Sequence, residues 1–102
     1  MASDSYEDNP GKPERLTGNR KFVVLRSGEV VIGKADEIVH PQIAERLLRE
    51  GKIDSYSDVV GGGVADCDHR RTSGASEEYG TYDKNVVRKS LEGWEVLDSS
   101  KE

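Results

Sequence analysis

His40 and Pro41 mark the start of a segment whose apolar residues recur at helical spacing. Proline is favoured at the first helical position, so this pair predicts a helix with His40 at or near the N-cap. The first turn of a helix carries free N–H groups and partial positive charge, which attract an anion such as phosphate. The same charge would keep the imidazole neutral near pH 7, able to attack phosphorus or move a proton for water. The alternative interpretation is that His40 is only a polar substitute for an N-cap residue.

Two other segments could contribute to an anion site. Three consecutive glycines, residues 61–63, could bring backbone N–H groups close to a phosphate, although no Gly-Lys-Ser/Thr follows as in a P-loop. A flexible hairpin turn is the other interpretation of this run. Ser76 lies between Gly74 and Gly80, and its hydroxyl could donate to a phosphate oxygen. Glu78 stands where a hydrolase nucleophile elbow needs its second glycine, so Ser76 is not predicted to be a nucleophile.

The residue types that bind metals cluster only between positions 66 and 69. Cys67 and His69 alternate there with two aspartates, but Cys-x-His is an unusual spacing and no second cysteine exists to complete a tetrahedral site. We therefore expect no metal and no cofactor.

Composition restricts the class of protein. The 102 residues carry a formal net charge of −5, and the only basic cluster is at residues 69–71. Because binding to phosphate backbones needs clustered Lys and Arg, no nucleic-acid partner is expected. No stretch is apolar enough to span a bilayer, and the start lacks the pattern of a signal peptide. Together with the single cysteine, which suits a reducing compartment, this favours a cytoplasmic protein without a membrane partner.

Large apolar side chains are almost confined to the chain after residue 20. We therefore expect a flexible polar tail over residues 1–19, one domain over residues 20–97 and a short tail over residues 98–102. A domain of this size can bury only a modest core.

The first half of that domain is predicted to be two strands and a helix. Residues 21–26 and 29–34 are rich in β-branched side chains and flank Ser27-Gly28, which predicts a hairpin. The helix would end at Gly51 as a C-cap. Its buried face would hold Ile43, Ala44, Leu47 and Leu48, and its water-facing side would hold Glu45, Arg46, Arg49 and Glu50.

The second half is predicted to contain further strands and one more helix. Strands are expected at residues 53–60, ending in the glycine run, and at residues 64–70, where apolar and polar side chains alternate. Asp83 can cap a helix that carries Val86, Val87 and Leu91 on one face, and residues 94–97 form the last strand. The predicted fold is α/β of the α+β type, with one mixed sheet of about five to six strands and two helices packed on it.

The order of these features resembles the phosphohistidine phosphatase family, also called the Janus/ocnus family. The similarity extends from Lys21 to about Val96, and the order of the features carries it, since no single motif is highly specific. The matching features are residues 21–26 with their leading lysine, residues 29–33, His40, the glycine run at 61–63, the Gly-x-Ser-x-x-Tyr-Gly segment at 74–80 and Trp94-Glu95-Val96.

This resemblance implies removal of the phosphoryl group from protein phosphohistidine without a metal ion. His40 matches the catalytic histidine, and Lys21 matches a lysine that contacts phosphate. Ser76 matches a serine of the phosphate-binding segment, where backbone N–H groups near Glu77 and Glu78 would also donate. Pro41, which follows the histidine, is also expected to bind the substrate. A phosphorylated protein substrate, phosphate or a similar anion as ligand, and a monomeric state are the corresponding expectations.

The sequence departs from the family pattern at two positions. Val64 follows the glycine run and Ile32 precedes Gly33, whereas the family has arginines there that would face phosphate or substrate. These losses favour an alternative: a catalytically weak or inactive module that binds phosphorylated or acidic partner segments. A third possibility is an interaction protein that pairs a sheet edge with a partner strand. Whether the chain is an enzyme is thus open at this point.

Overall fold

The computed structural model describes residues 17–99. Most of the expected N-terminal tail and the last three residues lie outside this range. In chain order, the elements are strands β2 (Asn19–Leu25) and β3 (Val30–Ile32), helix α1 (His40–Arg49), the 3₁₀ helix η2 (Tyr56–Asp58), strands β4 (Val59–Asp66) and β5 (Arg71–Gly74), helix α2 (Lys84–Ser90) and strand β6 (Glu95–Ser99).

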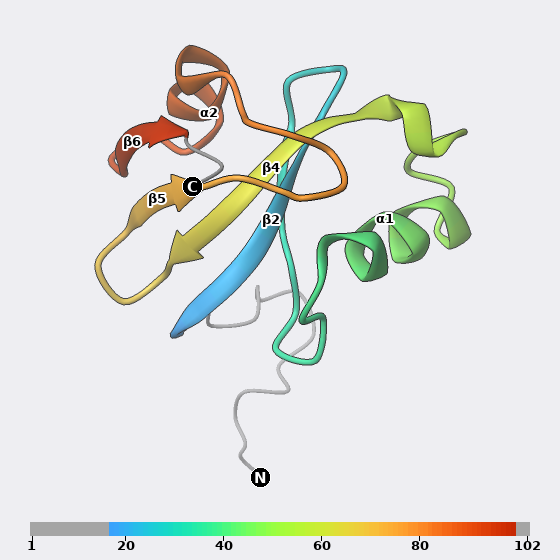
Figure 1. Ribbon diagram of the computed structural model, residues 1–102, viewed down its shortest axis with the longest axis horizontal. Helices are drawn as coiled ribbons and strands as arrows, with labels where there is room; N and C mark the ends of the chain where they lie inside the picture. Colours follow the sequence, from blue (N-terminus) through green and yellow to red (C-terminus); the bar gives the residue numbers. More distant parts are fainter. Residues whose placement is uncertain (1–16, 100–102) are drawn as a thin grey trace, which may run out of the picture.

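The strands form one five-stranded sheet in the order β3-β2-β4-β5-β6. All neighbours are antiparallel except β5 and β6, which run parallel, so the sheet is mixed. The longest strands, β2 and β4, lie at its centre (Figure 1). This confirms the predicted α+β fold, with one mixed sheet and two helices.

The two helices cover opposite faces of the sheet, and each face has its own apolar cluster. Strand β2 contributes side chains to both clusters, because successive side chains of a strand point to opposite faces of the sheet. Val23 and Leu25 belong to the cluster beneath α1, whereas Phe22 and Val24 belong to the cluster beneath α2. The continuous apolar run in β2 therefore reflects a strand buried on both sides.

Each cluster is completed by one helix and the segments beside it. The cluster beneath α1, called cluster 1, also contains Ile43, Ala44, Leu47, Ile53 and Val59. The cluster beneath α2, called cluster 2, also contains Ala65, Tyr82, Val87 and Val96, with Trp94 packed against it. Burying each apolar side chain contributes about 1.5–3 kcal/mol, so both faces stabilise the same sheet.

The predicted hairpin and second helix are confirmed. Strands β2 and β3 pair with Val23 opposite Val31, and Gly28 in the turn has φ 97°, a conformation open to glycine. Asp83 caps α2: its side chain accepts hydrogen bonds from the N–H groups of Asn85 and Val86.

The strand expected at residues 53–60 is wrong in most of its length. Residues 56–58 form η2 instead, and strand β4 begins only at Val59. Local polar side chains favour the turn: Ser55 Oγ accepts from Ser57 N–H, and Asp58 accepts from Asp54 N–H. Such side chain to backbone bonds offer the chain an alternative to a strand ladder.

The glycine run and the segment after it also differ from expectation. Residues 61–63 lie in the middle of β4, so they form neither a hairpin turn nor a loop. The strand expected at residues 64–70 contributes only its first three residues, because β4 ends at Asp66 and a turn follows. In that turn Asp66 accepts from His69 N–H, and Arg70 has φ 53°.

Between residues 17 and 99, neither helix has the length and apolar character needed to cross a membrane.

Candidate functional site

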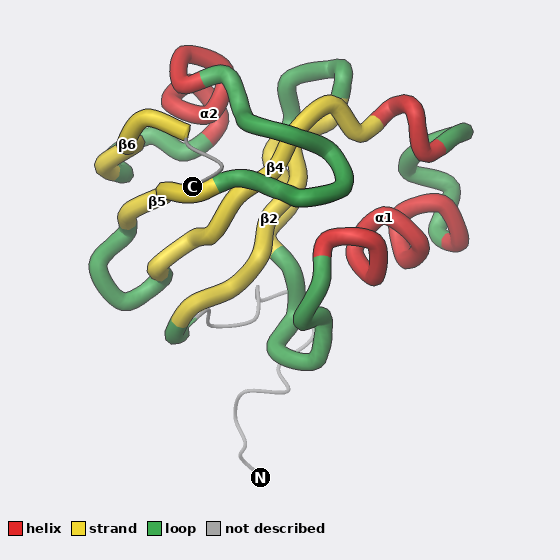
Figure 2. The backbone as a smooth tube through the Cα atoms, viewed as in Figure 1, coloured by secondary structure: helices red, strands yellow, loops and turns green. Residues whose placement is uncertain are grey.

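An open pocket of about 470 Å³ lies between the N-terminus of α1, the central strands and the segment after β5. Figure 2 shows that segment as a loop that leaves β5, crosses over β4 and returns to α2. The lining residues are Lys21, Ile38, Val39, His40, Val64, Gly74, Ala75, Ser76, Glu77 and Glu78. The fold thus brings together five of the six residues predicted from the sequence. Pro41, the sixth, does not line the pocket.

Lys21 reaches the pocket from the central strand β2. Its partner across the ladder is Val64 on β4, which also lines the pocket. Lys21 lies two residues before Val23, so it shares the face of the sheet that α1 covers. The sheet register therefore places one ammonium group and one aliphatic side chain side by side on the pocket floor.

His40 is held in one orientation by a backbone carbonyl. Its Nε2 lies 2.9 Å from the carbonyl oxygen of Gly63, and the side chain is only 4% exposed. Because a carbonyl only accepts, Nε2 carries the hydrogen, and Nδ1 of the neutral ring keeps its lone pair. The Cδ2 atom of the ring faces Gly62, so Nδ1 lies on the side of the ring turned away from the strand.

Burial lowers the pKa of His40 below its usual 6.5, and the charge of Lys21 lowers it further. The hydrogen bond to Gly63 and the charge of Glu78 act in the opposite direction without reversing the shift. The imidazole is therefore neutral at pH 7. The sequence predicted this state from the helix dipole, but the structure attributes it mainly to removal of the ring from water.

The glycine run makes room for this arrangement. A Cβ atom on Gly62 would lie 2.9 Å from His40 Cδ2 and 3.2 Å from Ser76 Cβ, so both residues pack directly over this position. On the other face, a Cβ atom on Gly63 would lie 2.8 Å from the Tyr82 ring, and one on Gly61 would overlap the carbonyl oxygen of Thr81. Glycine is required here for close packing on both faces of a strand.

The start of α1 offers an anion fewer N–H groups than the sequence suggested. The N-cap is Val39 and His40 is the first helical residue, so His40 lies next to the N-cap, within the predicted placement at or near it. Gln42 Oε1 accepts from the N–H groups of Ile38 and Val39, and the Gln42 N–H bonds to the Val39 carbonyl. Since Pro41 has no N–H, the His40 N–H and the helix dipole remain as the attraction for an anion.

Ser76 is fully buried, and its hydroxyl oxygen already accepts two hydrogen bonds. The donors are the N–H groups of Glu78, at 3.2 Å, and Tyr79, at 3.0 Å. The Glu78 N–H, one of the amides expected to donate to phosphate, is thus used by Ser76 in this structure. Within residues 17–99, the Glu77 N–H has no hydrogen-bond acceptor. Ser76 shapes the loop, and the Glu77 amide is the donor left on this segment.

The carboxylates of the same loop dominate the charge of the pocket. Glu77 and Glu78 are exposed, and Lys21 is the sole basic residue among those lining it. No ion pair within residues 17–99 joins either glutamate to Lys21. The pocket thus has a formal charge of −1 at pH 7, with its one positive group on the floor.

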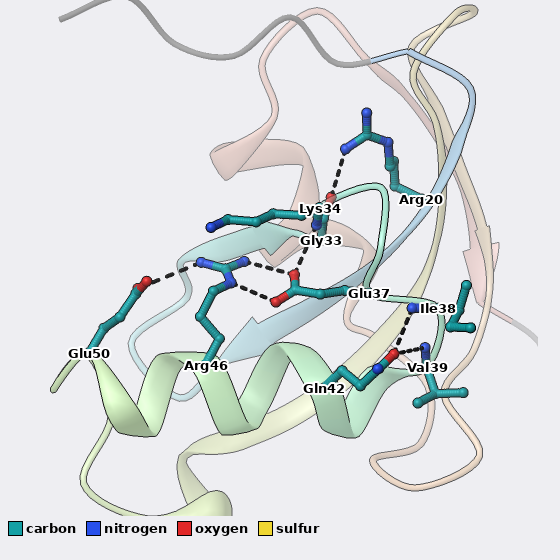
Figure 3. A network of polar contacts seen from close by, with 9 residues as sticks. All are labelled: Arg20, Gly33, Lys34, Glu37, Ile38, Val39, Gln42, Arg46 and Glu50. Atoms are coloured by element: carbon teal, nitrogen blue, oxygen red, sulfur yellow. Dashed lines mark hydrogen bonds and ion pairs between the residues drawn. The ribbon is translucent and has the colours of Figure 1, made fainter. Parts of the chain in front are cut away.

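An ion pair outside the pocket anchors the segment that leads to His40 (Figure 3). Glu37 Oε2 lies 2.7 Å from Arg46 Nε, and Glu37 Oε1 accepts from Arg46 Nη2 at 3.1 Å. Glu37 Oε1 also accepts from the Lys34 N–H, which closes the loop before α1. The side chains of Arg46 and Glu37 are 13% and 11% exposed. Arg46 was predicted to face water, and it instead fixes the start of its own helix.

Burial alone would raise the pKa of Glu37. The hydrogen bonds from Arg46 and from the Lys34 N–H, together with the positive charge of Arg46, outweigh it and hold the pKa below its usual 4.5. Sequence reasoning missed this pair. It also missed the Gln42 cap, although Gln at the third helical position is a recognisable signal of a capping box.

The two positions where the sequence lacks the family arginines differ in location. Val64 lines the pocket, whereas Ile32 packs against cluster 2 on the opposite face of the sheet. Of the two, only a cation at position 64 would face a ligand in this pocket. Ile32 therefore does not bear on anion binding here.

Residues 66–69 form a turn with one internal pair. His69 Nδ1 lies 2.9 Å from Asp66 Oδ2 on the surface. Residues 17–99 contain no group of three or more His, Cys, Asp or Glu side chains placed to hold a metal ion.

No family model, curated protein or solved structure matches the chain. The resemblance to phosphohistidine phosphatases thus rests on the residues and their order alone.

Proposed function

We propose that this protein is a metal-independent hydrolase that removes phosphoryl groups from phosphohistidine in proteins. One observation carries the proposal: Gly63 fixes the tautomer of a neutral His40, which lines a pocket that also contains Lys21. A neutral imidazole with a free lone pair is a competent nucleophile for phosphorus, and an ammonium group beside it attracts the phosphoryl oxygens. The family resemblance supports the same assignment.

In the proposed reaction, His40 Nδ1 attacks the phosphorus of the substrate. A bond forms between Nδ1 and phosphorus while the bond between phosphorus and the substrate imidazole breaks, and the departing imidazole takes up a proton from a water molecule. The hydroxide that this leaves then attacks the phosphorylated His40, which releases hydrogen phosphate and restores the neutral ring. Phosphoryl transfer of this kind depends on positioning and on charge stabilisation more than on further covalent chemistry.

Four groups around His40 contribute to this scheme. The Gly63 carbonyl accepts from Nε2 and stabilises the positive charge that the ring gains when Nδ1 is phosphorylated. Lys21 and the Glu77 N–H are donors for the phosphoryl oxygens. Ser76 is a positioning residue, since its hydroxyl holds the loop that carries this amide.

The deciding experiment compares the two histidines of the chain. His40→Ala and His69→Ala are incubated with a histidine-phosphorylated protein, and phosphate release is measured. We expect His40→Ala to lose at least about 100-fold in rate, the scale of a missing catalytic group, while His69→Ala keeps the parent rate. The parent should also carry a transient acid-labile phosphate on His40. Hydrolysis at the parent rate by His40→Ala, with circular dichroism showing a folded variant, would refute the proposal.

A second candidate is a module that binds a phosphorylated segment without turnover. The observation that favours it is the charge of the pocket, where Val64 takes the place of a family arginine and two glutamates accompany one lysine. Weak stabilisation of the transition state would then leave binding alone. Phosphate that shifts the NMR signals of Lys21 and His40, in a parent that releases no phosphate from any phosphohistidine protein, would select this candidate.

A further inference from the structure

The carboxylates of Glu77 and Glu78 have no cationic partner within residues 17–99. Some other acidic residues of this range are paired, such as Glu37 with Arg46, Glu95 with Arg71 and Asp98 with Lys84. The two glutamates instead stand together and exposed at the pocket, next to a floor that holds a single ammonium group. A phosphoryl dianion that enters alone would meet one attractive charge and two repulsive charges.

Part of the pocket lining is apolar. Ile38 and Val39 form this part and are 69% and 48% exposed, although most aliphatic side chains of this fold are buried or partly buried. Figure 3 shows both residues at the N-terminal end of α1, where the Gln42 side chain holds their backbone N–H groups. Because this cap and the Glu37–Arg46 pair fix the segment, the two side chains are presented to the ligand in a defined position.

Lys21 and His40 line the same pocket. A ligand that satisfies all of these groups carries its phosphoryl group beside Lys21 and His40 and positive charge toward Glu77 and Glu78. Lysine and arginine fit this requirement doubly, since their aliphatic stems can pack on Ile38 or Val39 while their charged ends reach water or carboxylate. Acidic or uncharged neighbours of the phosphorylated residue leave the repulsion from the glutamates uncompensated.

We infer that the pocket selects phosphohistidine segments with lysine or arginine beside the phosphorylated residue, through the paired carboxylates of Glu77 and Glu78. This specificity rests on the proposed function. It names the substrate class of the same site and makes the two glutamates specificity-determining residues. The carboxylates thereby gain a role that the hydrolysis itself does not require.

The test uses two phosphohistidine peptides that differ only in the residues on either side of the phosphohistidine, arginine in one and glutamate in the other. For the parent we expect kcat/KM to favour the arginine peptide about tenfold, as two partly exposed charge pairs would give. In E77Q/E78Q this preference should fall to about two- to threefold. The matched control is E45Q/E92Q, which removes the same charge from two exposed glutamates outside the pocket and should keep the preference of the parent.

A binding measurement separates failure of this inference from failure of the proposed function. Fluorescence anisotropy of the same peptides is recorded with His40→Ala, alone and combined with E77Q/E78Q. Equal hydrolysis of both peptides by the parent overturns the inference and leaves the hydrolase standing. If the parent hydrolyses neither peptide while the arginine peptide binds more tightly in a manner that depends on Glu77 and Glu78, the hydrolase fails and the charge selection holds. If the parent hydrolyses neither peptide and binds both equally, the inference and the proposed function are both overturned.

Discussion

The imidazole of His40 is buried in a pocket wall, and its Nδ1 makes no hydrogen bond within residues 17–99. Its burial has two consequences with a common cause, the removal of water from the ring. The protonated form is disfavoured, and the Nε2 hydrogen must find a protein acceptor, which is the Gly63 carbonyl. Tautomer and charge are thus set by the same packing that positions the ring over Gly62. At the residue scale, the position of the His40 ring depends on its hydrogen bond to the Gly63 carbonyl and on the absence of a side chain at Gly62.

We predict that His40 titrates below pH 6.5 in the free protein. Burial, reinforced by Lys21, lowers its pKa, so kcat/KM for phosphohistidine should stay constant from pH 8 to below 6.5 and fall only at more acidic pH. The imidazole NMR signals of the chain report this directly, because His69→Ala removes the only other histidine signal. A His40 signal with its midpoint above pH 6.5 would contradict the prediction.

At the scale of elements, strand β4 and the loop before α1 position the site. Strand β4 supplies the Gly63 carbonyl and the space over Gly62, and the loop delivers Val39 and His40 through the Glu37–Arg46 pair. Each acts through contacts between segments distant in sequence. Their roles can be separated by substitutions that leave the pocket-lining side chains intact.

Gly62→Ala should impair both stability and hydrolysis. The added methyl group would lie within 3 Å of Phe22 O and of His40 Cδ2, so we expect a loss of about 1–3 kcal/mol in the free energy of unfolding and a displaced imidazole. The control is Gly93→Ala, where φ is 87° but no atom lies within 4 Å. It should lose about 1–2 kcal/mol from backbone strain and retain its hydrolysis rate. Urea denaturation and the phosphate-release assay give the two readouts. An unchanged rate in Gly62→Ala would argue against the close packing described.

Glu37→Gln should lower stability by about 1–2 kcal/mol at pH 7, because it weakens a partly buried bidentate pair. The pKa of Glu37 is lowered by folding, so its contribution is fully present above its unfolded value of about 4.5 and is lost as pH falls through the lower folded value. The difference in unfolding free energy between parent and variant should therefore shrink on acidification.

The control for this substitution is Glu45→Gln on the same helix, an exposed residue without an ion pair in the described range. It should be neutral within about 0.5 kcal/mol at every pH. A difference between Glu37→Gln and the parent that persists unchanged to pH 2 would contradict an electrostatic origin.

At the scale of the whole molecule, a single sheet separates two small apolar clusters. Neither cluster alone is large, and β2 contributes to both, so the two faces depend on each other. The pocket lies on the α1 face only. The α2 face therefore supports the pocket through the sheet and contributes no residue of cluster 2 to its lining.

Unfolding should accordingly be cooperative across the sheet. Ile43→Val removes one buried methylene beneath α1 and should cost about 0.5–1.5 kcal/mol. The fluorescence of Trp94, packed against cluster 2 on the other face, should report the same shift in urea midpoint as circular dichroism. Ile38→Val, at a residue 69% exposed, is the matched control and should leave both midpoints unchanged. A Trp94 transition that does not move in Ile43→Val would show that the faces unfold separately.

The sequence predicted correctly those helices and strands that are specified by residues close together in the chain. The β2–β3 hairpin, the apolar face of α1 and the Asp83 cap of α2 follow from alternation, helical spacing and a capping side chain. These signals lie within a few residues of the structure they specify, which is why a sequence reveals them. That Lys21, His40 and Ser76 share one site was implied by the family resemblance, which the order of features in the chain carries.

Only the tertiary structure decided what the glycine run and the polar groups of the site do. From the sequence alone, the three glycines at residues 61–63 are typical of a turn. In the structure they lie in a strand, where His40, Ser76 and Tyr82 from other segments pack too close to leave room for side chains at positions 62 and 63. The Ser76 hydroxyl accepts hydrogen bonds from its own loop, and Arg46 pairs with Glu37. Of the two positions that lack the family arginines, Val64 lines the pocket and Ile32 does not. Each outcome depends on partners brought close by folding, and the charge and hydrogen-bonding state of a buried group is set by those partners more than by its own residue type.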